Sequence, residues 1–514
     1  MSVKAYLASD AAAVSLGADR LALRLQQLAD EHGLKLDLRR TGSRGMIWLE
    51  PLLEIEIGAG RLGFGPLAEA DLPGLIASRF ETSHARCVGL IDELDWMKRQ
   101  QRVTFVRCGI IEPTDFAQYR AARGLIGLQQ ALAMKATEIV TLITESGLRG
   151  RGGAAFPTGR KWETVLAQDT TEKFIACNAD EGDSGTFADR MMIEGDPFAL
   201  IEGMVIAGLA TGAQRGYIYL RAEYPRAARV MQRALLEARR NQLIGGNILG
   251  SRHAFDIELR VGAGAYICGE ETSMLESLEG RRGEVRVRPP MPAVRGLHGQ
   301  PTVVNNVLTL ATVPAILADG AASYRGLGRG ESRGTLALQL GGNVARGGLL
   351  ELPFGLTLED ALFSLGGGSA TGRPLRAAQV GGPLGAYLGR EEFDVTLDYE
   401  SLAARGAMLG HGGVVAFDDR ANLGLMARHA MQFCADESCG KCTPCRVGST
   451  RAVALLDALR AGTAGPDGLA ELEELCQIML QGSLCGLGGM APIPVQSIIK
   501  RFPAALGPNQ TEGH

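Results

Sequence analysis

Along the N-terminal part of the chain, apolar and polar positions recur with periods that change between strand and helix. Alternation with period two predicts strands at residues 3–8 and 34–39 and a hairpin-like segment at residues 43–66. Helical spacing predicts an amphipathic helix at residues 19–32 and a short helix at residues 71–80. Residues 81–125 are polar and mixed, with a break at Pro113. We therefore expect a small α/β domain over residues 1–80 and a linker over residues 81–125.

Beyond this segment, the pattern divides the chain into three further parts. Over residues 126–330 strands and helices alternate with glycine loops, with strands expected at residues 174–177, 217–221 and 254–261 and a helix at residues 226–241. Residues 331–405 carry short alternating strands and predict a small β-rich domain. Residues 420–505 are helical, with periodic segments at residues 423–434, 449–461 and 468–481. The expected fold class is an α/β multidomain protein that ends in a helical bundle.

Composition excludes several function classes. The 53 basic and 57 acidic residues give a net charge of −4, so we expect no nucleic-acid partner. No apolar stretch reaches membrane-spanning length, and the first residues lack the apolar core of a signal peptide, so we expect no direct membrane insertion. Ten cysteines, four of them in a motif, fit a reducing cytoplasm better than a disulfide scaffold.

Four cysteines near the C-terminus form the most specific motif. Cys439, Cys442 and Cys445 are spaced C-x2-C-x2-C, and Cys485 follows in a glycine turn. Four thiolates are the usual ligands of a [4Fe–4S] cluster. A structural zinc site is the alternative, although zinc favours two C-x2-4-C pairs, and unmetallated core thiols are a third possibility. Cys476 is a rival fourth ligand, but it lies within a helical run.

The 69 glycines concentrate in short loops, the densest of which predict a nucleotide or flavin site. In residues 146–161, Gly150, Gly152 and Gly153 leave backbone N–H groups free for an anion, and Arg151 and Lys161 add positive charge. An ordinary mobile loop is the alternative.

Two further loops carry acidic and amide side chains. Asn178, Asp180, Glu181 and Asp183 follow the strand expected at residues 174–177, where carboxylates can accept from ribose hydroxyls and favour NAD over NADP. Glu270 and Glu271 open a helix after a glycine turn, where acidic residues also serve as ordinary helix caps. Asn305 and Asn306 lie side by side, and the alternative for them is likewise a helix N-cap.

Together these motifs closely resemble the NADH-binding, FMN-containing flavoprotein subunit of respiratory complex I and its soluble relatives. The resemblance covers about residues 142–503 and rests on the order and spacing of the motifs, including G-L-R-G-R-G-G, N-A-D-E, G-E-E-T, V-N-N-V and C-G-x-C-x-P-C. It implies FMN held by a set of loop residues: Gly150, Arg151, Gly152, Gly153, Lys161, Asn178, Asp180, Tyr266, Glu270, Asn305, Asn306 and Thr309. It implies NAD(H) near Phe156, Glu181, Asp183 and Glu271, with Glu181 and Glu271 positioning the nicotinamide because hydride transfer needs no acid–base pair.

The resemblance also implies domains and partners. Residues 331–405 would form a ubiquitin-like β-grasp domain, and residues 1–80 resemble the thioredoxin-like fold of a [2Fe–2S] subunit. Residues 1–107 hold only Cys87, so this domain cannot bind a two-iron centre. Two departures concern the nucleotide: Met291 stands where the family often has an aromatic residue, and Asp183 where many members have glutamate.

The whole architecture looks most like the β subunit of cytosolic NAD-dependent molybdenum formate dehydrogenases. That likeness implies a molybdenum-containing α subunit and a small γ subunit with a [2Fe–2S] centre as partners, and NAD(H) as the substrate. The flavoprotein of an NAD-reducing hydrogenase, or of complex I, is the alternative within the same class. A nucleotide-binding assembly subunit without catalytic activity is the alternative from another class.

Overall fold

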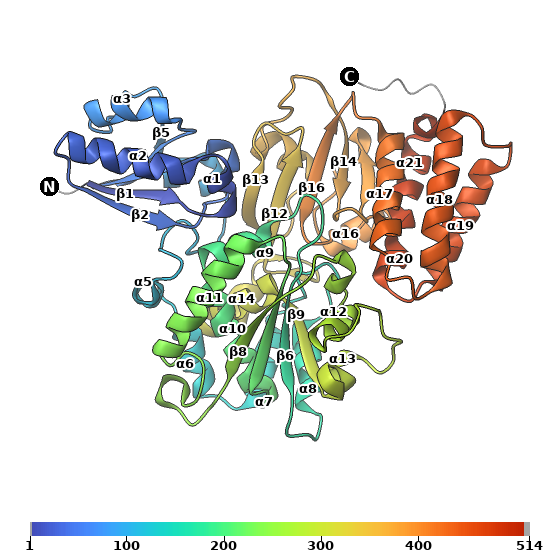
Figure 1. The fold of residues 1–514 in the computed structure, drawn as a ribbon, viewed down its shortest axis with the longest axis horizontal. Helices are drawn as coiled ribbons and strands as arrows, with labels where there is room; N and C mark the ends of the chain where they lie inside the picture. Colours follow the sequence, from blue (N-terminus) through green and yellow to red (C-terminus); the bar gives the residue numbers. More distant parts are fainter. Residues whose placement is uncertain (1–2, 508–514) are drawn as a thin grey trace.

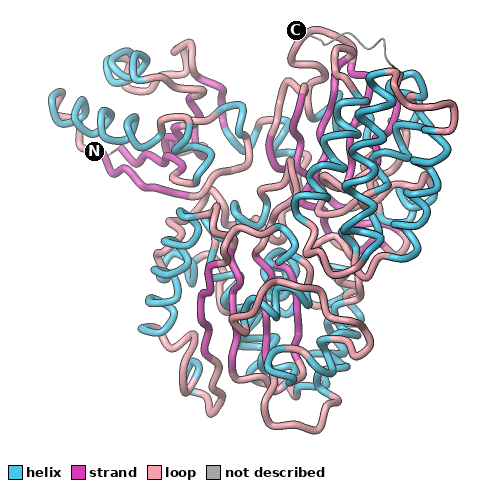
Figure 2. Tube along the Cα trace, turned by 45° about the vertical axis from the view of Figure 1, so that its right-hand side comes forward, coloured by secondary structure: helices cyan, strands magenta, loops and turns pink. Residues whose placement is uncertain are grey.

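The computed structural model describes residues 3–507 and contains three five- or four-stranded sheets, one two-stranded ribbon and a C-terminal group of helices (Figure 1). The N-terminal unit (residues 3–90) lies beside two others: a large central α/β unit (residues 126–325) and a second β-rich unit (residues 328–418) (Figure 1). The C-terminal helices (residues 423–501) cover the side of the second β-rich unit that faces away from the N-terminal unit (Figures 1 and 2). A mixed α/β architecture with a helical C-terminal region agrees with the expected fold class. None of the helices in the described part of the chain is long and apolar enough to cross a membrane.

The N-terminal unit is one sheet covered by helices. Its strand order is β2-β1-β3-β4-β5, with β1 and β2 parallel and the other pairs antiparallel. Helix α2 lies on the sheet because Leu21, Leu25 and Leu28 recur at helical spacing and are buried. The elements are β1 (Val3–Ala8), α1 (Ala11–Ser15), α2 (Ala18–Glu31), β2 (Leu36–Thr41), β3 (Leu53–Ile57), β4 (Gly60–Phe64), α3 (Leu72–Ala77) and β5 (Cys87–Leu90).

Residues 81–125, which we expected to be a linker, are part of the packed structure. Strand β5 pairs with β4 and completes the first sheet, and the segment continues through α4 (Asp95–Lys98) and α5 (Phe116–Ala121). Trp96 enters the core of the second β-rich unit, and Phe105 and Tyr119 enter the core of the central unit. The segment lacks a regular period because it crosses three cores with short elements, so its pattern resembled that of a linker.

The central unit is a parallel sheet of order β8-β7-β6-β9 with both faces covered. Helices α10 and α14 pack on the face that contains Ile175, and α12 on the face that contains Ala176. The strands are β6 (Phe174–Ala179), β7 (Arg215–Leu220), β8 (Asp256–Val261) and β9 (Thr302–Asn306). The helices are α6 (Ile126–Leu132), α7 (Ala136–Glu145), α8 (Thr158–Leu166), α9 (Ala188–Gly195), α10 (Pro197–Thr211), α11 (Pro225–Arg240), α12 (Glu271–Leu278), α13 (Pro292–Arg295), α14 (Val307–Asp319) and α15 (Ala321–Arg325).

The second β-rich unit extends beyond the segment predicted for it. Its sheet has the order β13-β12-β16-β14-β15, and the central strand β16 lies after residue 405, the predicted end of this domain. The elements are the ribbon β10 (Gly328–Arg329) and β11 (Ser332–Arg333), then β12 (Thr335–Gly342), β13 (Gly348–Pro353), β14 (Leu375–Val380), β15 (Ala386–Gly389), α16 (Tyr399–Ala404) and β16 (Gly413–Asp418). The glycines between residues 410 and 413 hid the start of β16 from the pattern.

The C-terminal helices pack on one another and on the β14–β15 end of this sheet. Tyr387 of β15 donates its backbone N–H to Ser497 Oγ of the last helix at 3.0 Å. The helices are α17 (Leu423–Glu437), α18 (Thr443–Ala461), α19 (Gly468–Gly482), α20 (Gly486–Met490) and α21 (Pro492–Arg501). The three long helices agree with those expected from the sequence.

A buried carboxylate joins the N-terminal unit to the central unit. Glu194, at the end of α9, is 2% exposed and accepts the backbone N–H of Ala11 at 2.6 Å. Burial raises the pKa of Glu194 from 4.5 to about 7. The raised pKa means that its contribution to stability is complete below about pH 4.5 and is lost as the pH rises through 7.

We expect Glu194→Gln to flatten the pH dependence of stability. The ionised carboxylate costs about 3 kcal/mol at pH 8.5, since each pKa unit corresponds to about 1.4 kcal/mol, whereas a glutamine keeps the acceptor and carries no charge. Thermal unfolding midpoints at pH 5.5 and pH 8.5 measure the effect, with the exposed Glu145→Gln as the control. Equal pH dependence in both variants and the wild type would contradict this account of the interface.

Candidate functional site

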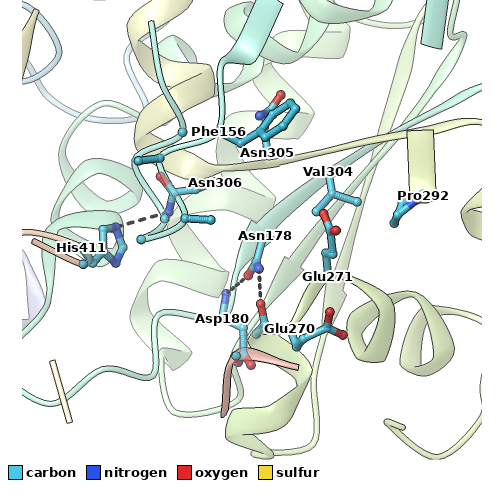
Figure 3. Close-up of a pocket in the computed structure, with 18 of the residues that line it drawn as sticks. Phe156, Asn178, Asp180, Glu270, Glu271, Pro292, Val304, Asn305, Asn306 and His411 are labelled. Carbon is cyan, nitrogen blue, oxygen red and sulfur yellow. Dashed lines mark hydrogen bonds between the residues drawn. The ribbon is translucent and has the colours of Figure 1, made fainter. Parts of the chain in front are cut away.

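A cavity of about 710 Å³ lies at the carboxyl ends of the central strands. In the order β8-β7-β6-β9 the chain moves outward from β6 to β8 and then returns to the other side of β6 as β9. Parallel α/β sheets bind ligands at the crevice where the strand order reverses, outside the carboxyl ends. Asn178 pairs with Asn306 across β6 and β9, so the register brings two predicted site residues to this crevice (Figure 3).

The glycine loop forms one wall of the cavity. Gly150, Gly152, Gly153, Phe156 and Lys161 line it, as predicted. A Cβ on Gly152 would lie 2.9 Å from Asn306 Cβ, so this position needs a glycine for the close approach of the loop to β9. Lys161 Nζ, on α8, donates to Val304 O at 2.8 Å and lies 3.5 Å from Glu271 Oε2. The loop therefore places backbone and one cation beside the crevice.

Two residues of the predicted set lie outside the cavity lining. The Arg151 side chain points away from it, is 7% exposed, and donates to Tyr324 Oη at 2.7 Å and Arg333 O at 2.8 Å. Thr309 is fully buried, and its hydroxyl accepts the Arg151 backbone N–H at 2.9 Å. The guanidinium therefore connects the glycine loop to α15 and β11 by hydrogen bonds. The charge of Arg151 in the sequence could not distinguish this structural role from anion binding.

The acidic segment after β6 forms the second wall. Asn178 donates to Gly269 O at 2.7 Å and accepts the Asp180 N–H at 3.1 Å, so its amide orders this turn. Asp180 Oδ2 is buried and has no hydrogen-bond partner in the described structure, and burial raises the pKa of Asp180 to about 7. Asp183 accepts from Tyr266 Oη at 2.7 Å, and burial raises its pKa.

Glu181 is more constrained than its neighbours. It is 3% exposed, and its carboxylate accepts the backbone N–H groups of Asp189 and Arg190, each at 3.1 Å. These N–H groups lie in the first turn of α9, where a helix favours a negative charge. Burial, followed by the nearby Asp189 charge, raises the pKa of Glu181 to about 7. The residue lines the cavity but is fixed by the protein backbone.

Glu270 and Glu271 form the third wall at the start of α12. Glu270 is the N-cap: its Oε2 accepts the N–H groups of Thr272 and Ser273, each at 2.9 Å, as in the alternative considered for it. Its other oxygen, Oε1, is buried without a hydrogen-bond partner in the described structure, and the Arg288 guanidinium lies 3.7 Å from it. Glu271 lies between two cations, Lys161 and Arg288, with Arg288 at 3.0 Å.

The two asparagines of β9 are held in different ways. Asn305 accepts from Trp162 Nε1 at 2.8 Å, which fixes the strand to α8. Asn306 caps α14 by accepting the Leu308 N–H at 2.8 Å, and its amide donates to Asp189 Oδ2 at 2.7 Å. Both asparagines line the cavity. Asn306 is therefore a helix N-cap and a residue of the cavity wall at the same time.

The structure adds residues from the second β-rich unit that the sequence analysis missed. His411, Met408 and Gly381 line the cavity beside Asp189 of α9. His411 lies in a run of glycines, a density that marked the other loops of the site and could have marked this one. Phe156 and Met291, both 47% exposed, also line the cavity.

The four predicted cluster ligands gather at the other side of this site. Cys439, Cys442, Cys445 and Cys485 belong to one group of packed residues together with Ile267 and Leu487. A C-x2-C-x2-C triplet with a distant fourth cysteine suits a [4Fe–4S] cluster, whereas structural zinc favours two C-x2-4-C pairs.

The rival ligand Cys476 lies elsewhere. It is fully buried in α19, in the helical core with Leu472 and Met479, and burial raises its pKa to about 12. Cys485, by contrast, is the N-cap of α20 and borders the other three thiols. The geometry therefore supports Cys485 as the fourth ligand.

Comparison with known families agrees with both halves of the site. Residues 143–315 match the Nuo51 FMN-binding domain, and residues 425–508 match the NADH-ubiquinone oxidoreductase-F iron-sulfur binding region. The F 2 subunit of the NADH-quinone oxidoreductase of Rhizobium meliloti is 45% identical over 387 residues, which are 75% of this chain and 92% of the relative. The chain belongs to the family of the FMN-binding F subunits of NADH-quinone oxidoreductase.

Other members act in different complexes. The NADP-reducing hydrogenase subunit HndC of Solidesulfovibrio fructosivorans is 44% identical over 417 residues, covering 81% of this chain and 84% of the relative. A solved NAD⁺-reducing [NiFe]-hydrogenase in the H₂-reduced state has a chain of similar fold, with a TM-score of 0.69 and 30% identity. The match covers all of this chain and 85% of the other.

The cofactors of the family are FMN and a [4Fe–4S] cluster, and the residues present fit both. Asp180 Oδ2 and Glu270 Oε1 are buried acceptors with no hydrogen-bond partner in the described structure, and both residues line the cavity. A buried acceptor without a donor is costly, so these atoms suit hydroxyl or N–H donors of a bound flavin. Lys161 supplies a cation, and the four thiols supply the ligand set of an iron–sulfur cube.

Proposed function

We propose that this chain is the diaphorase subunit of a multi-subunit oxidoreductase, passing electrons between its [4Fe–4S] cluster and NAD(H) through FMN. One observation carries the proposal: the cluster ligands border the wall of the flavin cavity. Gly486 and Leu487, the two residues that follow Cys485, line that cavity. Tyr266 also lines the cavity, and its backbone N–H donates to the Glu437 carboxylate at 2.9 Å. Glu437 lies two residues before Cys439. Electron transfer between the two cofactors would then need no further protein element.

The protein's own residues orient the reactants. When bound, FMN supplies the exchange between single electrons from the cluster and the hydride of the nicotinamide. Glu271 is held by Lys161 and Arg288, and Glu181 by the first turn of α9, so both carboxylates are fixed before a nucleotide arrives. Preorganised groups orient a bound ring at low entropic cost. These contacts support a positioning role for Glu181 and Glu271, with Phe156 beside the nucleotide.

The finer proposal is the β subunit of a cytoplasmic, NAD-dependent molybdenum formate dehydrogenase. Its partners would be a molybdenum-containing α subunit and a thioredoxin-like γ subunit with a [2Fe–2S] centre. Support comes from the N-terminal unit, in which Cys87 is the only cysteine among residues 1–107. A unit with one thiol cannot hold a two-iron centre, so it would serve as a docking surface. The ten cysteines, all unpaired, are consistent with a reducing compartment.

The sheet topologies support the two finer fold assignments. In the N-terminal unit β1 is parallel to β2 and antiparallel to β3, an arrangement compatible with a thioredoxin-like fold. In the second β-rich unit β12 pairs with β13 in antiparallel and with β16 in parallel fashion, which supports a ubiquitin-like β-grasp. Its single helical segment between β13 and β14 is Asp360–Leu365.

The flavoprotein of an NAD-reducing hydrogenase is the second candidate. The full-length structural match to the [NiFe]-hydrogenase chain favours it, and the missing N-terminal cluster cysteines weigh against it. Co-purification of the native complex followed by metal analysis separates the two: molybdenum would support the formate dehydrogenase, and nickel the hydrogenase. If the preparation contains neither metal but does contain complex I subunits, both candidates are overturned.

The diaphorase activity is tested on the purified chain reconstituted with FMN. We expect NADH-dependent reduction of ferricyanide, because this assay needs only the flavin and nucleotide sites. If protein with stoichiometric FMN shows no NADH-dependent dye reduction, the chain is a nucleotide-binding assembly subunit and the enzyme proposal fails.

We expect Asp183→Asn to reduce the preference for NADH over NADPH about tenfold. Asp183 lines the cavity, and a carboxylate near the ribose repels a 2′-phosphate. The ratio of kcat/KM values for the two nucleotides in the ferricyanide assay measures the effect. Asp183→Glu keeps the charge and serves as the control. An unchanged ratio in Asp183→Asn would place the ribose elsewhere.

A further inference from the structure

His411 brings a buried imidazole to the wall of the flavin cavity (Figure 3). It is 8% exposed and lies between α16 and β16, in a loop fixed by Gln339, whose side chain donates to the His411 carbonyl at 2.8 Å. Its Nε2 lies 3.2 Å from Asp189 Oδ1 and 3.3 Å from Asn306 Nδ2, and its Nδ1 lies 3.9 Å from Glu181 Oε1. The ring therefore joins the second β-rich unit to α9 and β9 at the cavity.

The carboxylates around this ring favour its protonated form over the neutral tautomer whose Nε2 would accept from Asn306 Nδ2. Burial by itself lowers the pKa of a histidine, but Asp189, Glu181 and Asp183 all face His411 and together raise its pKa to about 10. The Arg221 guanidinium is directed to the Glu181 carbonyl instead of to the Glu181 carboxylate. His411 is thus the cation of this carboxylate group, and it carries its charge at neutral pH.

We propose that the His411 imidazolium is an electrostatic positioning residue of the flavin site, which balances Glu181 and Asp189 and thereby raises the reduction potential of bound FMN. When Glu181 and Asp189 are both ionised, the three side chains carry a net charge of −1 with His411 charged and −2 without it. Reduction adds negative charge to the flavin, so an additional nearby negative charge disfavours the reduced state. The inference depends on FMN occupying this cavity and not on which electron donor the complex uses.

A divalent cation on the same three side chains is the competing explanation, because their donor atoms lie within 4.8 Å of one another. Three of the four carboxylate oxygens are already engaged: both Glu181 oxygens accept backbone N–H groups, and Asp189 Oδ2 accepts the Asn306 amide. The fourth, Asp189 Oδ1, is buried without a hydrogen-bond partner among the described residues and lies 3.2 Å from His411 Nε2, where a protonated ring can donate to it. An ion would also require His411 to lose its proton. The existing contacts therefore favour the imidazolium.

The decisive measurement is the midpoint potential of FMN in the full chain, by redox titration of the flavin absorbance. We expect His411→Asn to retain FMN and to lower the equilibrium constant for flavin reduction about tenfold, which is about 30 mV for a two-electron couple. Glu181→Gln removes a negative charge and should shift the potential upward. The double variant should return close to the wild-type value, because its net charge again equals −1.

His429→Asn is the matched control, since His429 is an exposed histidine on α17. A His411→Asn protein that binds FMN with unchanged potential from pH 6.5 to 8.5 would overturn the proposal. So would a stoichiometric divalent metal that is lost with His411. If His411→Asn fails to fold, Glu181→Gln alone still tests the direction of the shift, and an unchanged or lowered potential there would overturn the proposal.

A second readout does not involve the flavin. In protein labelled with ¹³C at histidine Cε1, the resonance that disappears in His411→Asn should keep the imidazolium chemical shift between pH 6 and pH 8. A neutral ring in that range would overturn the proposal. None of these measurements uses NADH turnover, so a failed diaphorase assay would leave their outcome interpretable.

Discussion

Replacing Cys485 with alanine should abolish the EPR signal of the reduced [4Fe–4S] cluster, and replacing Cys476 should leave it intact. Cys485 packs with Cys439, Cys442 and Cys445, whereas Cys476 lies in a separate helical core. A cube that loses one of its four thiolate ligands has an iron open to solvent, and such sites lose iron or convert to smaller clusters. Iron and acid-labile sulfide should fall together with the signal.

The two variants also differ in what else they disturb. Cys476 is fully buried, so Cys476→Ala removes one sulfur from a packed core and costs about 1 kcal/mol or more of stability. Cys485 is half-buried at the start of α20, and its replacement should cost less in the metal-free protein. A cluster lost from Cys476→Ala and retained in Cys485→Ala would reassign the ligand. Parallel loss in both variants, with unfolding excluded by circular dichroism, would also contradict the assignment.

The sequence identified the elements whose pattern is local. Helices α2, α17 and α19 and strands β6 to β8 were predicted within three residues, because each repeats one period over its whole length. Helix α18 begins six residues before its predicted start, within the cysteine motif. The elements that were missed depend on distant partners. Strand β5 has four residues and is defined by pairing with β4, and β16 follows a glycine run and is defined by its place between β12 and β14.

The same distinction applies to the site. Fourteen of the cavity-lining residues were implied by the resemblance to a known family, and the glycine loops and acidic turns among them are also features that mark the carboxyl ends of strands. The sequence did not predict His411, which reaches the cavity from a different unit, far from Asp189 along the chain. Arg151 was also assigned to the ligand by charge. Only the fold shows which direction a side chain takes from a loop whose backbone lines a cavity.

Arg151→Met should destabilise the protein by about 2–5 kcal/mol and weaken FMN binding only indirectly. The guanidinium is buried and donates to the Tyr324 hydroxyl, the Arg333 carbonyl and, at 3.1 Å, the Tyr399 hydroxyl. Burial alone would lower the pKa of Arg151, yet these hydroxyls raise it above its ordinary value. Its removal leaves buried polar groups without partners, at about 1–3 kcal/mol each.

Arg149→Met is the matched control, two residues away on the same loop. Arg149 forms an ion pair with the half-exposed Glu400 at 2.6 Å, donates to Ala155 O at 2.8 Å and lies over the Tyr399 ring. Its side chain is more exposed than that of Arg151, so its replacement should cost less stability. Denaturant midpoints of the metal-free proteins measure stability, and fluorescence quenching of FMN measures affinity at a temperature where both variants are folded. If Arg151→Met keeps wild-type stability and loses FMN affinity more than a hundredfold, then the guanidinium contacts the cofactor. In that case the loop must rearrange on binding, since the side chain now points into the protein, toward Tyr324 and Tyr399.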